Sequence, residues 1–124
     1  MRQELQELKV EIYQDGSVDA DEVKTLRTVL RLYGLGEQEA RLLLDINNVL
    51  SRHDRHTDFD ALLVESITDY VLDDDKVLSQ DKLNWLKENV FKDDRIDQNE
   101  KNIIAQIDKT AKTMPPGFGD LLRA

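Results

Sequence analysis

The sequence contains no cysteine. This absence excludes disulfide bonds, thiol catalysis and zinc or iron–sulfur sites that depend on cysteine ligands. Long apolar runs are missing too, since no stretch approaches the roughly 20 residues of a membrane-spanning helix. The amino-terminal residues also lack the apolar segment of a secretory signal. These absences predict a cytoplasmic protein with no direct insertion into a membrane.

Positive charge is scarce. Lys and Arg number 17 against 26 Asp and Glu, which gives a formal net charge of −9. Contacts with nucleic-acid phosphates need a surplus of basic groups, and anionic lipid repels an acidic protein. We therefore expect no nucleic acid as a partner, and we expect an unknown protein partner to be basic. Because apolar residues make up 40% of the chain, it should fold.

Helical periodicity runs through the chain. Six stretches repeat apolar residues at intervals of three and four, the first of them with Leu5, Leu8 and Ile12. No stretch alternates with the two-residue period of a strand. The stretch near residues 37–51 is apolar on more than one face, so we expect it at the centre. The sequence predicts a single compact all-α bundle of about six helices over residues 1–112, followed by a tail that contains Pro and Gly, residues 113–124.

A short unit recurs at the start of several predicted helices. It consists of an acidic turn, an apolar residue, a capping residue, two polar residues and usually Glu, as in Asp15-Gly16-Ser17-Val18-Asp19-Ala20-Asp21-Glu22. Related units begin at Leu78 and Ile96, and a degenerate one begins at Leu35. A capping residue three positions before Glu forms a capping box, and each cap stabilises its helix by about 1 kcal/mol. Capping alone accounts for the spacing, so any ligand role is additional to it.

The acidic turns are also candidate cation sites. With Gly16 at the sixth position of an EF-hand loop, acidic residues fall on ligand positions one, five, nine and twelve: Glu11, Asp15, Asp19 and Glu22. The third position holds Tyr13 where a carboxylate or amide is needed, so we do not expect a complete EF-hand. A looser divalent-cation site remains open, with Asp15, Asp19 and Glu22 as its ligands.

Two other polar segments carry candidate ligands. Asp73 and Asp74 belong to a run of three aspartates after a predicted helix, and they either collect Ca²⁺ or Mg²⁺ or form a solvated loop. His53 and His56 lie in a polar stretch between helices. They would bind Zn²⁺ or Ni²⁺ only on a shared helical turn, and an exposed loop is the favoured interpretation.

The tail is the remaining unusual segment. Pro115-Pro116-Gly117 ends the last predicted helix, and three apolar residues follow: Phe118, Leu121 and Leu122. Either this tail folds back over a groove, or it is an extended arm whose apolar residues bind a partner protein.

The repeated turns resemble those of the TerB-like family, small helical domains named for bacterial tellurite resistance. Residues 15–22 match the family's turn A-D-G-x-[IV]-D-x-x-E best, and residues 93–100 match it with Asp94 in place of Gly. The resemblance covers about residues 4–112. Two turns depart from it: Gly34-Leu35-Gly36 has no acidic residue, and the unit at Leu78 has Ser79 and Lys82 at the acidic positions. The resemblance implies a compact helical domain, a role in stress response or phage-related systems, and association with metal.

These observations predict a non-enzymatic, acidic protein-interaction module that is associated with a divalent cation. No nucleophile elbow, phosphate-binding loop, dinucleotide fingerprint or metalloprotease motif is present. Two alternatives remain open. The first is a Ca²⁺- or Mg²⁺-responsive protein with degenerate EF-hand-like turns, and the second is a small enzyme that uses buried carboxylates. An interaction module should expose an apolar patch, whereas an enzyme should hold carboxylates of perturbed pKa in a pocket.

Overall fold

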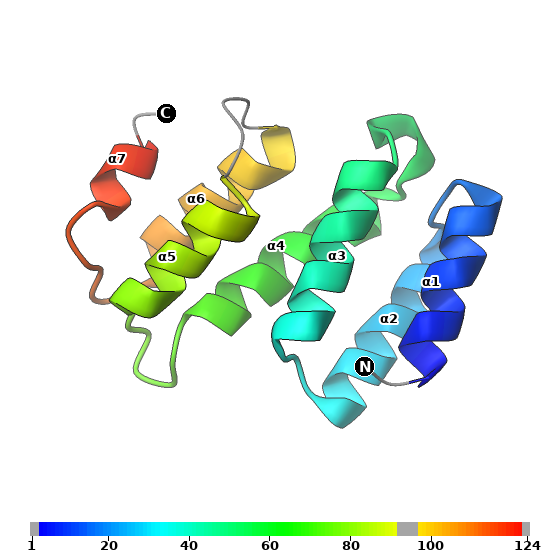
Figure 1. The fold of residues 1–124 in the computed structure, drawn as a ribbon, viewed down its shortest axis with the longest axis horizontal. Helices are drawn as coiled ribbons and strands as arrows, with labels where there is room; N and C mark the ends of the chain where they lie inside the picture. The colour runs from blue at the N-terminus through cyan, green and yellow to red at the C-terminus, as the bar shows by residue number, and fades with distance from the viewer. Residues whose placement is uncertain (1–2, 92–96, 123–124) are drawn as a thin grey trace. The chain divides into compact units, whose positions relative to one another are not determined.

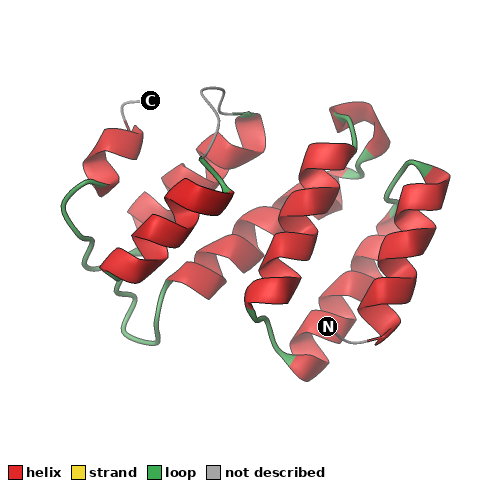
Figure 2. Ribbon diagram, in the orientation of Figure 1, coloured by secondary structure: helices red, strands yellow, loops and turns green. Residues whose placement is uncertain are grey.

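The computed structural model describes residues 3–91 and 97–122. Every regular element in these residues is a helix, and none is a strand (Figure 2). The elements are α1 (Gln3–Asp15), α2 (Ala20–Tyr33), α3 (Glu37–Val49), the short 3₁₀ helix η1 (Arg52–Asp54), α4 (Thr57–Val71), α5 (Gln80–Asn89), α6 (Gln98–Thr110) and α7 (Phe118–Leu122). The prediction of an all-α fold is confirmed. The six predicted stripes correspond to α1 to α6, and the sequence did not predict α7.

The chain divides into two units, residues 1–63 and 64–124, and the boundary falls inside α4. The first unit contains α1, α2, α3, η1 and the first part of α4. The second contains the rest of α4, then α5, α6 and α7. No helix in residues 3–91 and 97–122 is long and apolar enough to cross a membrane.

In the first unit, α1 and α2 form an antiparallel hairpin (Figure 1). The predicted apolar stripe of α1 is its buried face, which consists of Leu5, Leu8 and Ile12. Helix α3 buries apolar residues on more than one side, as its sequence predicted: Ala40, Leu42, Leu43, Leu44 and Ile46. Burial of these stripes supplies the main stabilisation, because apolar area removed from water contributes about 25 cal/mol per Å².

The carboxyl end of α3 is held by Arg55. The last carbonyls of a helix have no partner within it, so a neighbouring donor stabilises them. The Nη1 atom of Arg55 donates to the carbonyls of Asn47 at 3.1 Å and Leu50 at 2.7 Å, and its Nε atom donates to Asp60 Oδ1 at 3.1 Å. One guanidinium thus joins the end of α3 to the first turns of α4.

The predicted helix caps are present. Asp19 and Asp97 each accept a hydrogen bond from the backbone N–H of the glutamate three residues later, and that glutamate accepts one from the aspartate's own N–H. These are complete capping boxes. The hydroxyl of Ser79 accepts from the N–H of Lys82 and caps α5. The acidic turn before α6 falls mostly on residues 92–96, which lie outside the described part of the chain. The resemblance of residues 93–100 to the TerB-like turn, with Asp94 in place of Gly, therefore falls partly outside the described residues.

In the second unit, the tail folds back onto the helices. The N–H of Lys112 donates to the carbonyl of Lys76, and the N–H of Leu78 donates to the carbonyl of Thr113. Phe118 is only 1% exposed and belongs to the core of this unit. The sequence predicted a boundary between the helical domain and the tail after residue 112. In the structure, the residues on both sides of this position are hydrogen-bonded to the turn at residues 76–78.

Candidate metal centre

Three carboxylates meet where the α1–α2 hairpin turns. Glu11 and Asp15 are four residues apart on α1, so they share one face of that helix, and Glu22 lies in the first turn of α2. One carboxylate oxygen from each residue lies within 4.8 Å of the other two. The hairpin creates this group, because its turn returns the chain along the face of α1 that carries the first two acids.

Glu22 differs from its two neighbours in burial. It is 8% exposed, whereas Glu11 and Asp15 are exposed. Its Oε1 atom accepts a hydrogen bond from the N–H of Asp19 at 3.0 Å, and its Oε2 atom is buried without a hydrogen-bond partner. A buried polar atom that lacks a partner is unfavourable, and such atoms are rare in folded proteins. A partner for this oxygen would therefore stabilise the fold.

The electrostatics of this group oppose ionisation of Glu22. Burial raises the pKa of Glu22, and the hydrogen bond from the N–H of Asp19 partly opposes this effect. The negative charges of Asp19, Glu11 and Asp15 raise the pKa further. A bound cation would remove the repulsion among these carboxylates, so the group is suited to hold positive charge.

The structure brings two of the three predicted ligands together. Asp15 and Glu22 belong to the group, whereas Asp19 does not. Asp19 is the N-cap of α2, and its Oδ1 atom accepts from the N–H of Glu22 at 2.8 Å. Glu11 takes its place. The sequence signal for Glu11 was its four-residue spacing from Asp15 within one helix, a spacing that places both side chains on the same face.

The aspartates after α4 organise a turn. Asp73 Oδ1 accepts hydrogen bonds from the N–H groups of Asp75 and Val77, both at 2.9 Å. Lys76, inside this turn, has a φ of 62°. Asp73 and Asp74 form no metal-type group with other His, Asp or Glu residues in the described ranges 3–91 and 97–122. The structure thus gives Asp73 a backbone-capping role and leaves Asp74 exposed.

The two histidines also lie outside any such group of described residues. His53 is in η1, and His56 follows it in the connection to α4. The Nδ1 atom of His56 accepts from the N–H of Asp58 at 3.0 Å. Both histidines line a hollow of about 500 Å³, and Ser17, Val18 and Asp19 of the α1–α2 turn line it too.

The apolar residues predicted to bind a partner have a different position. Phe118 is buried, so the folded chain does not present it to a partner, and Leu121 is half-buried. The side chain of Leu122 lies outside the described part of the structure. Large exposed apolar side chains lie in the first unit instead, and the sequence analysis missed them: Val10, Tyr13, Leu32, Tyr33 and Val49.

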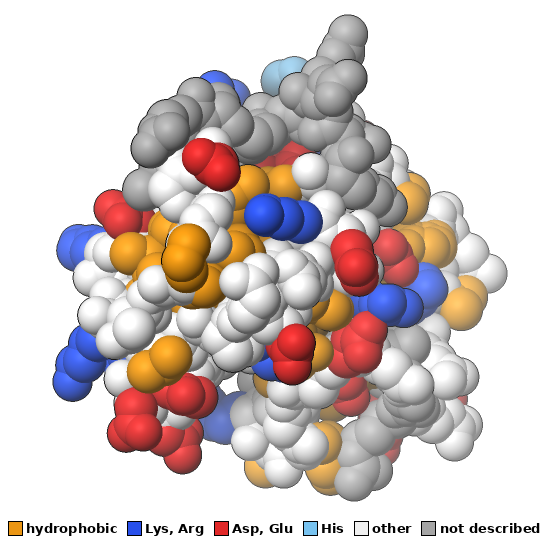
Figure 3. All heavy atoms as spheres, turned by 60° about the vertical axis from the view of Figure 1, so that its left-hand side comes forward, with side chains coloured by type: hydrophobic (Ala, Val, Ile, Leu, Met, Phe, Trp, Pro, Cys, Tyr) orange, Lys and Arg blue, Asp and Glu red, His pale blue; other side chains and the backbone are white. Residues whose placement is uncertain are grey.

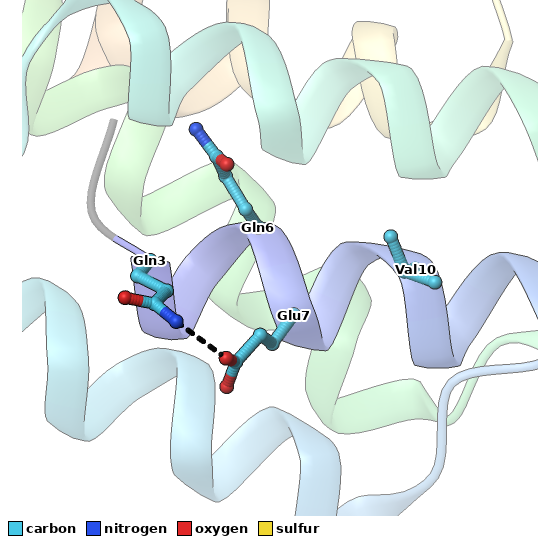
Figure 4. Close-up of a pocket in the computed structure, with 4 residues that line it drawn as sticks. All are labelled: Gln3, Gln6, Glu7 and Val10. Atoms are coloured by element: carbon cyan, nitrogen blue, oxygen red, sulfur yellow. Dashed lines mark hydrogen bonds between the residues drawn. The ribbon is translucent and has the colours of Figure 1, made fainter.

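An open hollow of about 620 Å³ lies along α1 beside Val10. Figure 4 shows Gln3 and Glu7 on one side of the helix, joined by a hydrogen bond of 3.0 Å, and Gln6 and Val10 on the other side. On the face shown in Figure 3, charged side chains of both signs are interspersed with apolar ones.

No protein-family model, curated protein or solved structure matches this chain. The resemblance to the TerB-like family therefore depends on the turn sequences alone.

Proposed function

We propose that this chain is a non-enzymatic, acidic helical module whose first unit binds a divalent cation at Glu11, Asp15 and Glu22. Two observations carry the proposal: Glu22 places one carboxylate oxygen within 4.8 Å of Glu11 and Asp15, and its Oε2 atom is buried without a hydrogen-bond partner. A cation would supply the missing partner and offset the repulsion that raises the pKa of Glu22.

The chemistry of the group favours a hard cation of the calcium class. All three ligands are carboxylates, whereas zinc sites are built mainly from nitrogen and sulfur ligands. Calcium and magnesium both bind oxygen ligands, calcium at about 2.3–2.6 Å and magnesium at about 2.0–2.1 Å. Carboxylate oxygens that lie within 4.8 Å of one another are close enough to share one such ion. Calcium accepts the more irregular ligand geometry of the two, so it is the ion that we test first.

A protein partner is the second part of the proposal. Val10 and Tyr13 lie one turn apart on α1 and are 53% and 36% exposed. Asp45 of α3 lies close enough to Tyr13 to raise the pKa of its phenol, after the larger effect of burial, and the exposed Val49 follows Asp45 by one turn. Exposed apolar side chains beside acidic ones suit a basic, amphipathic partner. Stress response remains part of this proposal through the TerB-like resemblance.

The enzyme alternative has less support. Burial and neighbouring negative charges raise the pKa of Glu22, but this carboxylate lies at a helix cap. Neither of the two hollows described above includes Glu22 in its lining.

Calorimetric titration of chelator-stripped protein with CaCl₂, MgCl₂ and ZnCl₂ tests the cation site. We expect saturable calcium binding that Glu11→Gln weakens at least tenfold. Glu7→Gln is the matched control, because it removes the same charge one turn earlier on α1, outside the carboxylate group. It should leave the affinity within about threefold, as expected for a screened surface charge. Absence of saturable binding, or equal losses in the two variants, would show that the carboxylates do not form a site.

A further inference from the structure

We infer that a cation at Glu11, Asp15 and Glu22 also suppresses local opening of the connection between α3 and α4, residues 50–56. This inference rests on the proposed function and concerns the regulation of the same site. It follows from contacts within the first unit that link the carboxylate group to that connection.

The first link is the carboxylate of Glu22, which has two roles. Its Oε1 atom accepts the N–H of Asp19 in the capping box, its Oε2 atom is buried without a hydrogen-bond partner, and one of its oxygens lies within 4.8 Å of Glu11 and Asp15. An ion held by Glu22 and by the two acids of α1 would fasten the N-cap of α2 to the last turn of α1. Opening of the turn at residues 16–19 would then require loss of the ion.

The second link is a pair of backbone hydrogen bonds from this turn. The N–H of Val18 donates to the carbonyl of Asp54 at 2.9 Å, and the N–H of His56 donates to the carbonyl of Val18 at 2.9 Å. Val18 and Arg55 thus form a parallel bridge. Figure 1 shows the α1–α2 turn and the α3–α4 connection at the same end of the unit. The connection has no regular structure beyond the three residues of η1, and this bridge is one of the contacts that restrain it.

The third link continues through Arg55. The side chain of this bridge residue is 10% exposed and holds the carbonyls of Asn47 and Leu50 together with Asp60. If the α1–α2 turn opens, the bridge is lost and Arg55 loses the backbone position from which it reaches α3 and α4. The hollow that carries both histidines, between the turn and the connection, would change with it.

Amide hydrogen exchange, resolved by NMR on the full chain with and without CaCl₂, tests this inference. Three amides report on the linked segments: Val23 (bonded to Asp19), Val18 and His56. For openings that release the ion, exchange slows by the factor 1 + [L]/Kd, which is about 100-fold at 100 times Kd. The amide of Lys101, bonded to Asp97 in the second capping box, is the internal control and should change less than about threefold.

The outcomes separate this inference from the proposed function. Slowing at Val18, Val23 and His56, abolished by Glu11→Gln and retained in Glu7→Gln, supports the coupling. Slowed exchange at Val23 with unchanged exchange at His56 overturns the coupling. If calorimetry shows calcium binding in that case, the proposed function still stands. Equal slowing at Lys101 also overturns it, because the effect would then extend over the whole chain. Absence of calorimetric binding together with unchanged exchange overturns both.

Discussion

Replacement of Glu22 by glutamine should stabilise the cation-free protein. Glutamine retains an oxygen that can accept the N–H of Asp19, so the capping box remains. Its amide nitrogen replaces the buried, unpartnered oxygen, and its neutral side chain is not repelled by the charges of Glu11 and Asp15. A buried unsatisfied polar atom costs about 1–3 kcal/mol. We therefore expect Glu22→Gln to raise the free energy of unfolding by about 1–2 kcal/mol at neutral pH without cation.

Calcium should reverse this order of stability. The wild-type chain should gain RT ln(1 + [L]/Kd), which is about 2.7 kcal/mol at 100 times Kd. Glu22→Gln lacks one of the three charged ligands, so its affinity and its gain should be much smaller. Urea unfolding followed by circular dichroism, in chelator and in excess CaCl₂, measures both differences. The wild type should be the less stable protein in chelator and the more stable one in calcium.

Glu100→Gln is the matched control. Glu100 accepts the N–H of Asp97 at 3.1 Å in the second capping box, as Glu22 does in the first. Eleven residues before Glu100 stands Asn89, whereas Glu11 stands eleven residues before Glu22. Glu100→Gln should change the stability by less than about 0.5 kcal/mol in both conditions. The reasoning would be refuted if Glu22→Gln destabilised the cation-free protein, or if it gained as much from calcium as the wild type.

Three further predictions concern stability. The burial and the repulsion that raise the pKa of Glu22 destabilise the fold when Glu22 is ionised. In chelator, the extra free energy of unfolding of Glu22→Gln over the wild type should therefore shrink as pH falls from the raised pKa toward the ordinary glutamate value. A difference in urea unfolding that grew on acidification would contradict this. Phe118→Ala should lower the free energy of unfolding by about 3–5 kcal/mol, because this side chain is fully buried; a loss below about 1 kcal/mol would show that the tail is not part of the core. Arg55→Ala removes two hydrogen bonds at the end of α3 and one to Asp60 of α4, and it should cost about 3 kcal/mol in the same assay; Arg55→Lys should recover only part of this loss, and full recovery would argue against the multidentate contact.

Local sequence was sufficient to predict the helices. The three-to-four-residue spacing of Leu5, Leu8 and Ile12 predicted the buried face of α1, because side-chain direction in a helix repeats every 3.6 residues. The capping boxes could be predicted for the same reason, since their partners are only three residues apart. Helix α7 was not predicted because its five residues carry too short a periodic pattern.

Contacts between distant residues could not be derived in this way. The sequence left open whether Phe118 extends from the protein or folds back, and only the packing of the second unit decided that it is buried. The sequence also did not predict the hydrogen bonds of Arg55. Its partners are brought together only by the path of the chain between α3 and α4: Asn47, Leu50 and Asp60.

The candidate site combines both kinds of information. The sequence by itself determined that acidic residues cluster around the first turn, and that Asp19 and Glu22 have the spacing of a cap. Only the tertiary structure decided which carboxylates meet. The antiparallel return of α2 brings Glu22 to the face of α1 that carries Glu11 and Asp15. Asp19 instead caps α2, because its side chain accepts a hydrogen bond from the N–H of Glu22. The physical reason is that a cap depends on local backbone geometry, whereas a group of three side chains depends on how two helices pack.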